Sequence, residues 1–425
     1  MLNMIKQTIL QQKNEQSNLL KIPYIQRDNL DKVREQIDTP LIKVVTGPRR
    51  AGKSVFSLLL LKDKNFAYLN FDDENLVKAE NYDEIVQAMF EVYPAPQYFL
   101  FDEIQNLPAW ELFVNKLHRR NYNILLTGSN ARLLSKELAT TLTGRHLTYE
   151  ILPFSFREFL EAKNVRFSKD DLTLPEIKGR FLNAFEEYLK KGGYPEIVTK
   201  GLDVKTYLAT LFDSVLLKDI VKRYKVRFTS KLYDLATYLI SNTASEFSFT
   251  KLKNILGFAS VSTVEKYLGY LEESYLFFVL NRFSFKVKQQ IKAPRKIYLV
   301  DNGFIEAKAF QFSPDTGRLM ENLAFVEFIR RGYVPNLDLF YYKTRNNREV
   351  DVVVRRENRI EELVQVSLAS ADHNTREREM KALREASEEL DCRNLTIITW
   401  DKEGEEKVKD KVIRFLPMWE WLLNT

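Results

Sequence analysis

The stretch from Ile42 to Leu60, IKVVTGPRRAGKSVFSLLL, restricts the fold of this 425-residue chain more than any other part of the sequence. Its β-branched start, at 42–46, predicts a buried strand, and the apolar run after Lys53 predicts a helix. Between them lies GPRRAGKS, which has the spacing of the phosphate-binding loop, G-x-x-x-x-G-K-[ST]. Because strand, loop and helix come in the order that this motif requires, the sequence predicts a nucleoside-triphosphate site.

The chemistry of the loop explains its residue types. Gly47 and Gly52 let the backbone curl so that successive N–H groups converge on a polyphosphate. We expect Lys53 to reach the β- and γ-phosphates and the Ser54 hydroxyl to bind Mg²⁺. The expected cofactors are therefore ATP and Mg²⁺. The full predicted nucleotide-binding set is Gly47, Pro48, Arg49, Arg50, Ala51, Gly52, Lys53 and Ser54.

Two acidic residues follow a second predicted strand. Four apolar residues, at 98–101, run directly into Asp102 and Glu103. A buried parallel strand that ends in two carboxylates is what a phosphate-loop enzyme requires. Asp102 can bind Mg²⁺ through water, and Glu103 can act as the general base on the attacking water. An ordinary surface Asp-Glu pair is the alternative, and the phosphate loop upstream makes it the weaker one.

Three further polar residues complete the predicted catalytic set. A strand at 124–127 ends in Thr-Gly-Ser-Asn, so Ser129 or Asn130 can project from its carboxyl end and sense the γ-phosphate. Arg145, just before a strand at 146–151, is placed to reach a neighbouring subunit's nucleotide as an arginine finger, which implies a homo-oligomer. A salt-bridged surface arginine is the alternative. Taken in chain order, the strands predict a parallel sheet with crossover helices.

Composition and charge exclude several classes of protein. A hydrophobic content of 45% excludes wholesale disorder, and the single Cys392 excludes a disulfide framework. No apolar run approaches the roughly 20 residues of a membrane helix, and the N-terminus lacks the apolar core of a signal peptide, so we expect a cytoplasmic protein without a membrane partner. The net charge is +6, but residues 201–300 hold 16 Lys/Arg against 8 Asp/Glu. This local surplus favours nucleic-acid contact.

The chain resembles the AAA+-like branch of P-loop ATPases. More closely, it resembles the prokaryotic, largely archaeal, ATPases that join such a domain to a C-terminal nuclease-like domain. The motifs that carry the resemblance are GPRRAGKS (47–54), YLNFDDENL (68–76), FDEIQ (101–105), TGSN (127–130), TGR followed by LPFSFREF (143–159), KKGGYPEIV (190–198) and LLKDIVKRYKVR (216–227). The resemblance covers nearly the whole chain.

Pattern and resemblance together predict an α/β P-loop NTPase (AAA+-like) sheet with three further parts. The predicted domains are an N-terminal helix and ATPase core at 1–152, a helical lid at 153–228, a winged-helix domain at 229–310 and a PD-(D/E)XK-like domain at 311–425. The C-terminal domain is predicted to have the α/β fold of restriction endonucleases.

The middle domain is predicted from two helices joined by a turn at 257–260 and followed by a two-stranded ribbon, the pattern of a winged helix. The second helix, at 262–275, would be the recognition helix. The expected phosphate contacts are Lys251, Lys253, Lys266, Arg282, Lys286, Lys288, Lys292, Arg295 and Lys296. Winged helices also serve as protein-contacting spacers, but the basic surplus favours DNA. Three acids on the recognition helix, Glu265, Glu272 and Glu273, favour sequence-independent contact.

In the last part, a helix, a hairpin, a strand, a helix and a strand follow one another between 317 and 401. This order resembles the PD-(D/E)XK fold, in which carboxylates and a lysine surround Mg²⁺. The resemblance assigns the helix acid to Glu321 or Glu327 and the strand acid to Asp351.

The third element of that motif departs from the pattern. It reads Gln365-Val366-Ser367, with a neutral residue in place of a carboxylate and a hydroxyl in place of the lysine. Such a site should bind Mg²⁺ weakly and cleave poorly. Lys343 and Arg348 are candidates to replace the lysine in space. We expect a degenerate nuclease site formed by Glu321, Asp351 and Gln365.

The sequence as a whole predicts a Mg²⁺-dependent ATP hydrolase that acts on DNA as an oligomeric motor or remodeller. The DNA could be duplex or branched, such as a four-way junction. One alternative is a nucleotide-dependent signalling switch with a protein partner. Another is a metal-dependent nuclease gated by ATP.

Overall fold

The computed structural model describes residues 2–129, 145–167, 170–309, 315–368, 373–408 and 411–424. They divide into two compact units. The first unit consists of Met1–Pro153 with Glu273–Tyr275, and the second of Phe154–Glu272 with Leu276–Thr425. The four predicted domains are a finer division and stay a prediction.

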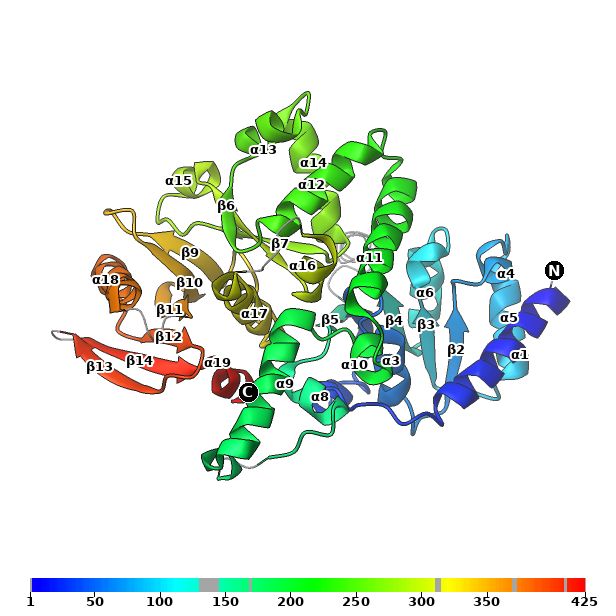
Figure 1. Ribbon diagram of the computed structural model, residues 1–425. Coiled ribbons are helices and arrows are strands. Elements are labelled where there is room, and N and C mark those ends of the chain that lie inside the picture. The colour runs from blue at the N-terminus through cyan, green and yellow to red at the C-terminus, as the bar shows by residue number, and fades with distance from the viewer. Residues whose placement is uncertain are drawn as a thin grey trace. The chain divides into compact units, whose positions relative to one another are not determined.

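The first unit is built on a parallel sheet of five strands in the order β2-β3-β4-β1-β5, of which Figure 1 labels β2, β3, β4 and β5. The strands are β1 (Ile42–Thr46), β2 (Phe66–Asn70), β3 (Tyr98–Asp102), β4 (Asn123–Gly128) and β5 (His146–Glu150). The predicted parallel sheet is confirmed, and each predicted strand end agrees with the structure to within one residue. Because β4 lies between β1 and β3, the residues at its carboxyl end stand between the phosphate loop and the acidic pair.

Helices cover both faces of this sheet, as parallel sheets require. The helices are α1 (Leu2–Leu19), α2 (Leu30–Arg34), α3 (Lys53–Leu60), α4 (Glu74–Val77), α5 (Tyr82–Val92), η1 (Ile104–Asn106) and α6 (Trp110–His118). Along β3, Phe99 and Phe101 join the core that includes Phe113 of α6, whereas Leu100 joins the core that includes Phe56 of α3. The period-2 alternation of apolar side chains therefore gives each face its own core.

The second unit begins with helices. They are α8 (Phe156–Ala162), η2 (Asp171–Thr173), α9 (Pro175–Lys191), α10 (Pro195–Lys200), α11 (Val204–Ser214) and the π-helix η3 (Val215–Lys222). Ser155 and Glu158 form a reciprocal capping box at the start of α8. The helical pattern predicted for 153–228 is thus present in these elements.

A small antiparallel sheet, β6-β8-β7, follows with its own helices. The elements are α12 (Thr229–Ser241), β6 (Ser245–Phe247), α13 (Phe249–Leu256), α14 (Val261–Glu273), β7 (Phe277–Asn281), α15 (Val287–Lys292), β8 (Arg295–Leu299) and α16 (Gly303–Lys308). The predicted ribbon is formed by β7 and β8, in register Phe277↔Leu299. The segment between them holds the short helix α15, which the sequence pattern did not predict.

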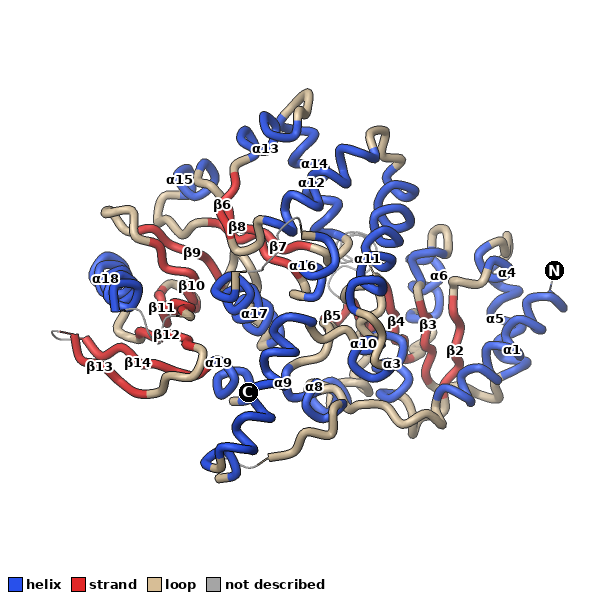
Figure 2. The backbone as a smooth tube through the Cα atoms, in the orientation of Figure 1, coloured by secondary structure: helices blue, strands red, loops and turns tan. Residues whose placement is uncertain are grey.

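The C-terminal part of the second unit is a mixed sheet of six strands in the order β13-β14-β12-β11-β10-β9; Figure 2 shows the strands in red. Its elements are α17 (Thr316–Arg330), β9 (Leu339–Lys343), β10 (Glu349–Arg356), β11 (Arg359–Ser367), α18 (His373–Leu390), β12 (Leu395–Thr399), β13 (Gly404–Val408), β14 (Lys411–Pro417) and α19 (Met418–Leu423). The predicted order of helix, hairpin, strand, helix and strand is present. α17 is buried on all sides from Leu319 to Ile329, the mark of a core helix.

Among the helices that the structure describes, none is both long and apolar enough to cross a membrane.

Candidate active site

The loop before α3 has a backbone that only glycine accommodates at its ends. Gly52 precedes α3 with φ +97°, in the left-handed region, and Gly47 has φ +141°. A Cβ atom on Gly47 would lie 2.1 Å from the carbonyl oxygen of Ile151. The loop leads directly into the N-terminus of α3, where N–H groups without intrahelical partners attract anions. The geometry is that of a phosphate cradle.

Lys53, the first residue of α3, lies across this loop. Its Nζ donates to the Pro48 carbonyl oxygen at 3.0 Å and is 4.0 Å from Glu103 Oε1. The side chain is buried, with 5% of the residue exposed. The ammonium is therefore held at the mouth of the cradle, where it forms an ion pair with Glu103 of the acidic pair.

Asp102 ends β3 with a carboxylate that three hydroxyl groups contact. Ser54 Oγ donates to Oδ1 at 2.9 Å, Thr127 Oγ1 donates to the same oxygen, and Tyr68 OH donates to Oδ2 at 3.2 Å. Burial, followed by the charge of Glu103, raises the pKa of Asp102 above its ordinary value. A cation next to this carboxylate would favour its ionised form. The Ser54 hydroxyl and the Asp102 carboxylate are oxygen ligands of the kind that Mg²⁺ prefers, so the residues fit this ion.

Glu103 follows with φ +50°, a left-handed conformation that is rare outside glycine and is found at functional sites. Its backbone N–H donates to Thr127 Oγ1 at 3.0 Å, and its side chain accepts from Gln105 Nε2. Ser129 Oγ donates to Glu103 Oε2 at 3.4 Å. Thr127 thus connects the two acids, and Ser129 lies beside the predicted general base. The other predicted sensor, Asn130, lies outside the described residues.

Three residues of this site were not predicted from the sequence. Thr127 and Tyr68 contact Asp102, as described above, and the buried Arg27 donates to the carbonyl oxygens of Ala51 at 2.9 Å and Leu152 at 2.5 Å. Thr127 could have been predicted from the sequence, because it is a polar residue near the end of the strand β4, which pairs with the strand that ends in Asp102. Arg27 offers no local signal, because its partners are 24 and 125 residues away.

Arg145 lies just before the edge strand β5 and is exposed. Its carbonyl oxygen accepts from the N–H of Ile42 at 3.0 Å, which fixes the backbone at the start of the strand. The arginine-finger assignment requires a second subunit and stays a prediction.

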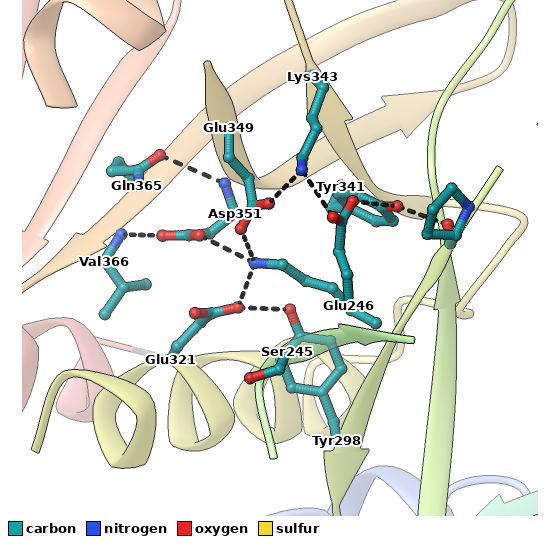
Figure 3. Close-up of polar contacts among 12 residues, drawn as sticks. Ser245, Glu246, Tyr298, Glu321, Tyr341, Lys343, Glu349, Asp351, Gln365 and Val366 are labelled. Carbon is teal, nitrogen blue, oxygen red and sulfur yellow. Dashed lines mark hydrogen bonds and ion pairs between the residues drawn. The ribbon is translucent and has the colours of Figure 1, made fainter. Parts of the chain in front are cut away.

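A second acidic centre lies in the second unit. Figure 3 shows Glu321 of α17 and Glu349 and Asp351 of β10 directed toward one another. Lys296 Nζ, from β8, lies 2.7 Å from Glu321 Oε1, 2.6 Å from Glu349 Oε1 and 3.1 Å from Asp351 Oδ1. We predicted Lys296 as a phosphate contact, and that prediction is wrong because the residue is 1% exposed and its ammonium is bound by carboxylates.

The surrounding residues settle which of the predicted alternatives meet at this centre. Glu327 pairs with Arg330 and Arg331, so Glu321 is the helix acid of the cluster. Arg348, a candidate for the missing lysine, pairs with Glu385 at 3.1 Å. The other candidate, Lys343, lies 2.6 Å from Glu246 and 3.6 Å from Glu349 (Figure 3).

Gln365 has a structural partner at this centre. Its Oε1 accepts from the backbone N–H of Asp351 at 3.3 Å, and Asp351 Oδ2 accepts from the N–H of Val366 at 3.0 Å. Burial alone would lower the pKa of Lys296, but the carboxylates, Glu321 foremost, raise it well above its ordinary value. The carboxylates therefore favour the charged form of the lysine.

A basic cleft of about 690 Å³ lies between α15 and the hairpin of β9 and β10. Its cationic lining residues are Arg282, Lys286, Lys288, Lys292, Lys343 and Arg345. Lys286, Lys288 and Lys292 are exposed and form no ion pair with any residue that the structure describes. Phe285 is 75% exposed at the same cleft.

Comparison with known proteins agrees with the first unit's geometry. A family model described as an AAA domain matches residues 39–160, which contain the phosphate loop and the acidic pair. Two models described as domains of unknown function, DUF8612 and DUF4143, match residues 182–315 and 316–421. Sheet order, loop geometry and family model together define a P-loop ATPase domain of the AAA class.

Relatives extend over most of the chain. The uncharacterized protein MJ1544 of Methanocaldococcus jannaschii is 38% identical over 401 residues, covering 90% of this chain and 88% of the relative. An uncharacterized protein of Haemophilus influenzae is 34% identical over 356 residues, covering 79% of this chain and 85% of the relative. The chain belongs to the family of these proteins.

Among solved structures, the Walker-type ATPase PABY2304 of Pyrococcus abyssi is similar at 14% identity and a TM-score of 0.43, covering 68% of this chain and 99% of that one. The likeness is distant, and the assignment rests on the family model and the site.

Proposed function

We propose that the protein is an ATP hydrolase that acts on DNA as a homo-oligomer. The observation that carries the proposal is the hydroxyl–carboxylate contact of Ser54 with Asp102, with Lys53 and Glu103 beside it at the carboxyl edge of the sheet. These four side chains come from the start of α3 and from the carboxyl end of β3, and they provide the donor and acceptor set for phosphoryl transfer to water.

Each residue has a separate role in this proposal. Backbone N–H groups at the start of α3 would hold the phosphates, and Lys53 would balance their charge. Mg²⁺, when bound by Ser54 and Asp102, supplies charge stabilisation on the phosphate oxygens. Glu103 would orient and deprotonate the attacking water, with its carboxylate positioned by Gln105 and Ser129.

The DNA part of the proposal is supported by the basic cleft. Three of its lysines, Lys286, Lys288 and Lys292, are exposed and form no ion pair within the described part of the chain, so their charges are available to phosphates. Phe285 presents an exposed ring on which an unstacked base could pack. A concave basic surface with an aromatic side chain suits a nucleic-acid strand.

Two finer parts of the proposal concern the middle region and assembly. The order α12, β6, α13, α14, β7, β8 supports a winged helix, with α14 as its recognition helix. The exposed Arg145 supports an arginine finger that completes a neighbouring subunit's site. In a mixture of Arg145→Ala and Glu103→Gln subunits, a finger predicts partial recovery of ATP hydrolysis, because some interfaces then carry both intact residues.

The first experiment measures ATP hydrolysis and ATP binding in the same variants. We expect Lys53→Ala to lose nucleotide binding or turnover. We expect Glu103→Gln to keep ATP binding and to hydrolyse about 10²–10⁴-fold more slowly, the range for loss of a general base. The matched control is Glu321→Gln, an acid-to-amide change in the second unit. Normal turnover in both Lys53→Ala and Glu103→Gln would contradict the proposal.

The second experiment measures DNA affinity and DNA-stimulated ATP hydrolysis with linear duplex, single-stranded and four-way-junction DNA. We expect affinity to fall steeply between about 50 and 200 mM salt. The variant Lys288→Glu/Lys292→Glu should bind at least about tenfold more weakly, whereas Lys178→Glu/Lys205→Glu, with the same change in net charge, should bind almost normally. Salt-independent ATP hydrolysis that no DNA stimulates would favour the signalling switch.

A further inference from the structure

The second acidic centre has an arrangement that the proposed function does not use. Three carboxylates from two elements, α17 and β10, converge on one point, and the nitrogen of Lys296 occupies that point. We propose that the Lys296 ammonium is the built-in cation of this centre. In this proposal the centre is closed to divalent metal ions in the natural protein and opens to them when the lysine is removed.

The distances match an ammonium ion. Nζ lies 2.6 to 3.1 Å from one oxygen of each of Glu321, Glu349 and Asp351, the length of charge-assisted N–H···O bonds. The ammonium donates hydrogen bonds to Glu321 and Asp351 and forms a third ion pair with Glu349. Mg²⁺ would require oxygens at about 2.0–2.1 Å, and Ca²⁺ at about 2.3–2.6 Å. In agreement, no group of acidic side chains in the described ranges is arranged to hold a metal ion as it stands.

The lysine cannot easily leave this position. Its residue is 1% exposed and belongs to β8, whose strand pairing with β7 fixes the backbone on both sides of it. Tyr298, two residues along the same strand, donates its OH to Glu321 Oε1 at 2.7 Å and holds that carboxylate toward Lys296. Expelling the ammonium would leave buried charges without their partners, which is strongly unfavourable.

An entry path exists from the other side. Glu321, Glu349, Asp351 and Gln365 line a cleft of about 940 Å³. A metal ion could therefore reach the carboxylates through solvent once the ammonium is absent. Because the carboxylate oxygens lie 2.6 to 3.1 Å from the position of Nζ, Ca²⁺ needs a smaller contraction than Mg²⁺ and is the better probe.

The test is Ca²⁺ binding by isothermal titration calorimetry on the full chain without nucleotide, so that the phosphate-loop site does not contribute. We expect the natural protein to bind no Ca²⁺ at this centre, and Lys296→Gln to gain one Ca²⁺ site that binds at least about tenfold more tightly than any Ca²⁺ binding by the natural protein. The matched control, Lys296→Gln/Asp351→Asn, should lose that site. A folded Lys296→Gln variant that gains no Ca²⁺ site would overturn the proposal.

A second measurement covers the case in which Lys296→Gln does not fold. The natural protein and Asp351→Asn are titrated with Ca²⁺ under the same conditions, and the proposal expects equal heats, because the centre is closed in both. Ca²⁺ binding by the natural protein that Asp351→Asn abolishes would show that the ammonium does not close the site. Neither result depends on ATP hydrolysis or on DNA.

Discussion

Each of the two acidic centres of the protein contains a lysine and carboxylates, but the contacts of the lysine differ between them. In the first unit, Lys53 donates to a backbone carbonyl and stays 4.0 Å from Glu103, while hydroxyl groups contact Asp102. In the second unit, Lys296 donates directly to the carboxylates. A buried carboxylate needs a neighbouring cation. In the proposed function the first centre takes Mg²⁺ from solution, whereas in the second centre Lys296 provides the cation.

The elements that form each centre explain how two centres with similar residues can have different chemistry. β1 and β3 both pair with β4 in parallel, so the polar ends of the three strands meet at one edge and Asp102 lies beside Ser54. The second centre is assembled from a helix and two strands of different sheets. There the lysine comes from β8, outside the sheet that carries Asp351.

The largest expected difference is in ATP hydrolysis. Asp102→Asn should slow hydrolysis by roughly 100-fold or more, because several kcal/mol of charge stabilisation through the metal ligand are lost. Asp351→Asn makes the same chemical change in the other centre and should leave the rate unchanged. Steady-state ATP hydrolysis at saturating ATP checks both. Equal effects of the two substitutions would contradict the assignment of ATP hydrolysis to the first centre alone.

The next difference is in stability. Lys296→Met should lower the free energy of unfolding by about 3–5 kcal/mol, because it leaves buried carboxylates without their cation. Lys53→Met should lower it by a smaller amount, because Lys53 Nζ lies 4.0 Å from Glu103 whereas Lys296 Nζ lies 2.6 to 3.1 Å from three carboxylates. Urea unfolding followed by circular dichroism measures both. A larger loss for Lys53→Met than for Lys296→Met would contradict this order.

A smaller effect is expected at Thr127. Thr127→Val removes a donor to Asp102 and an acceptor for the Glu103 N–H, so it should cost about 1–3 kcal/mol of stability and slow ATP hydrolysis. Thr127→Ser keeps the hydroxyl and should restore hydrolysis. If serine fails as valine does, the methyl group rather than the hydroxyl is what matters.

The smallest expected effect is a pH dependence of stability that arises from Lys43, a buried lysine whose ammonium contacts no carboxylate in the described part of the chain. Burial lowers the pKa of Lys43, on β1, from 10.5 to about 8, whereas carboxylates raise that of Lys296. Between pH 8 and 10.5 the unfolded chain binds more protons at Lys43 than the folded one, so the stability contribution of this group rises with pH. Lys43→Met should remove this rise.

Urea unfolding at pH 7 and at pH 9.5 measures the effect, and the advantage of Lys43→Met over the natural protein should shrink at the higher pH. If the stability advantage of Lys43→Met stays constant between the two pH values, Lys43 keeps its proton in both the folded and the unfolded chain, and its pKa is not lowered.

The sequence by itself determined the sheet of the first unit and the residues of its phosphate loop. Strand ends followed from apolar runs, and Gly47, Gly52, Lys53 and Ser54 from a motif whose parts are adjacent in the chain. Asp102 and Glu103 were found because a parallel sheet gathers the carboxyl ends of its strands at one edge. Such signals are local, and local physics of backbone and periodicity produces them.

Only the tertiary structure decided which side chains meet across long separations. Lys296 lies 25 residues from Glu321 and 55 from Asp351, and its place in a basic segment predicted the opposite environment. Arg27 likewise meets Leu152 across 125 residues. Charge in a sequence says that a residue prefers water or a counter-ion, and the packing of separate elements decides which of the two it receives.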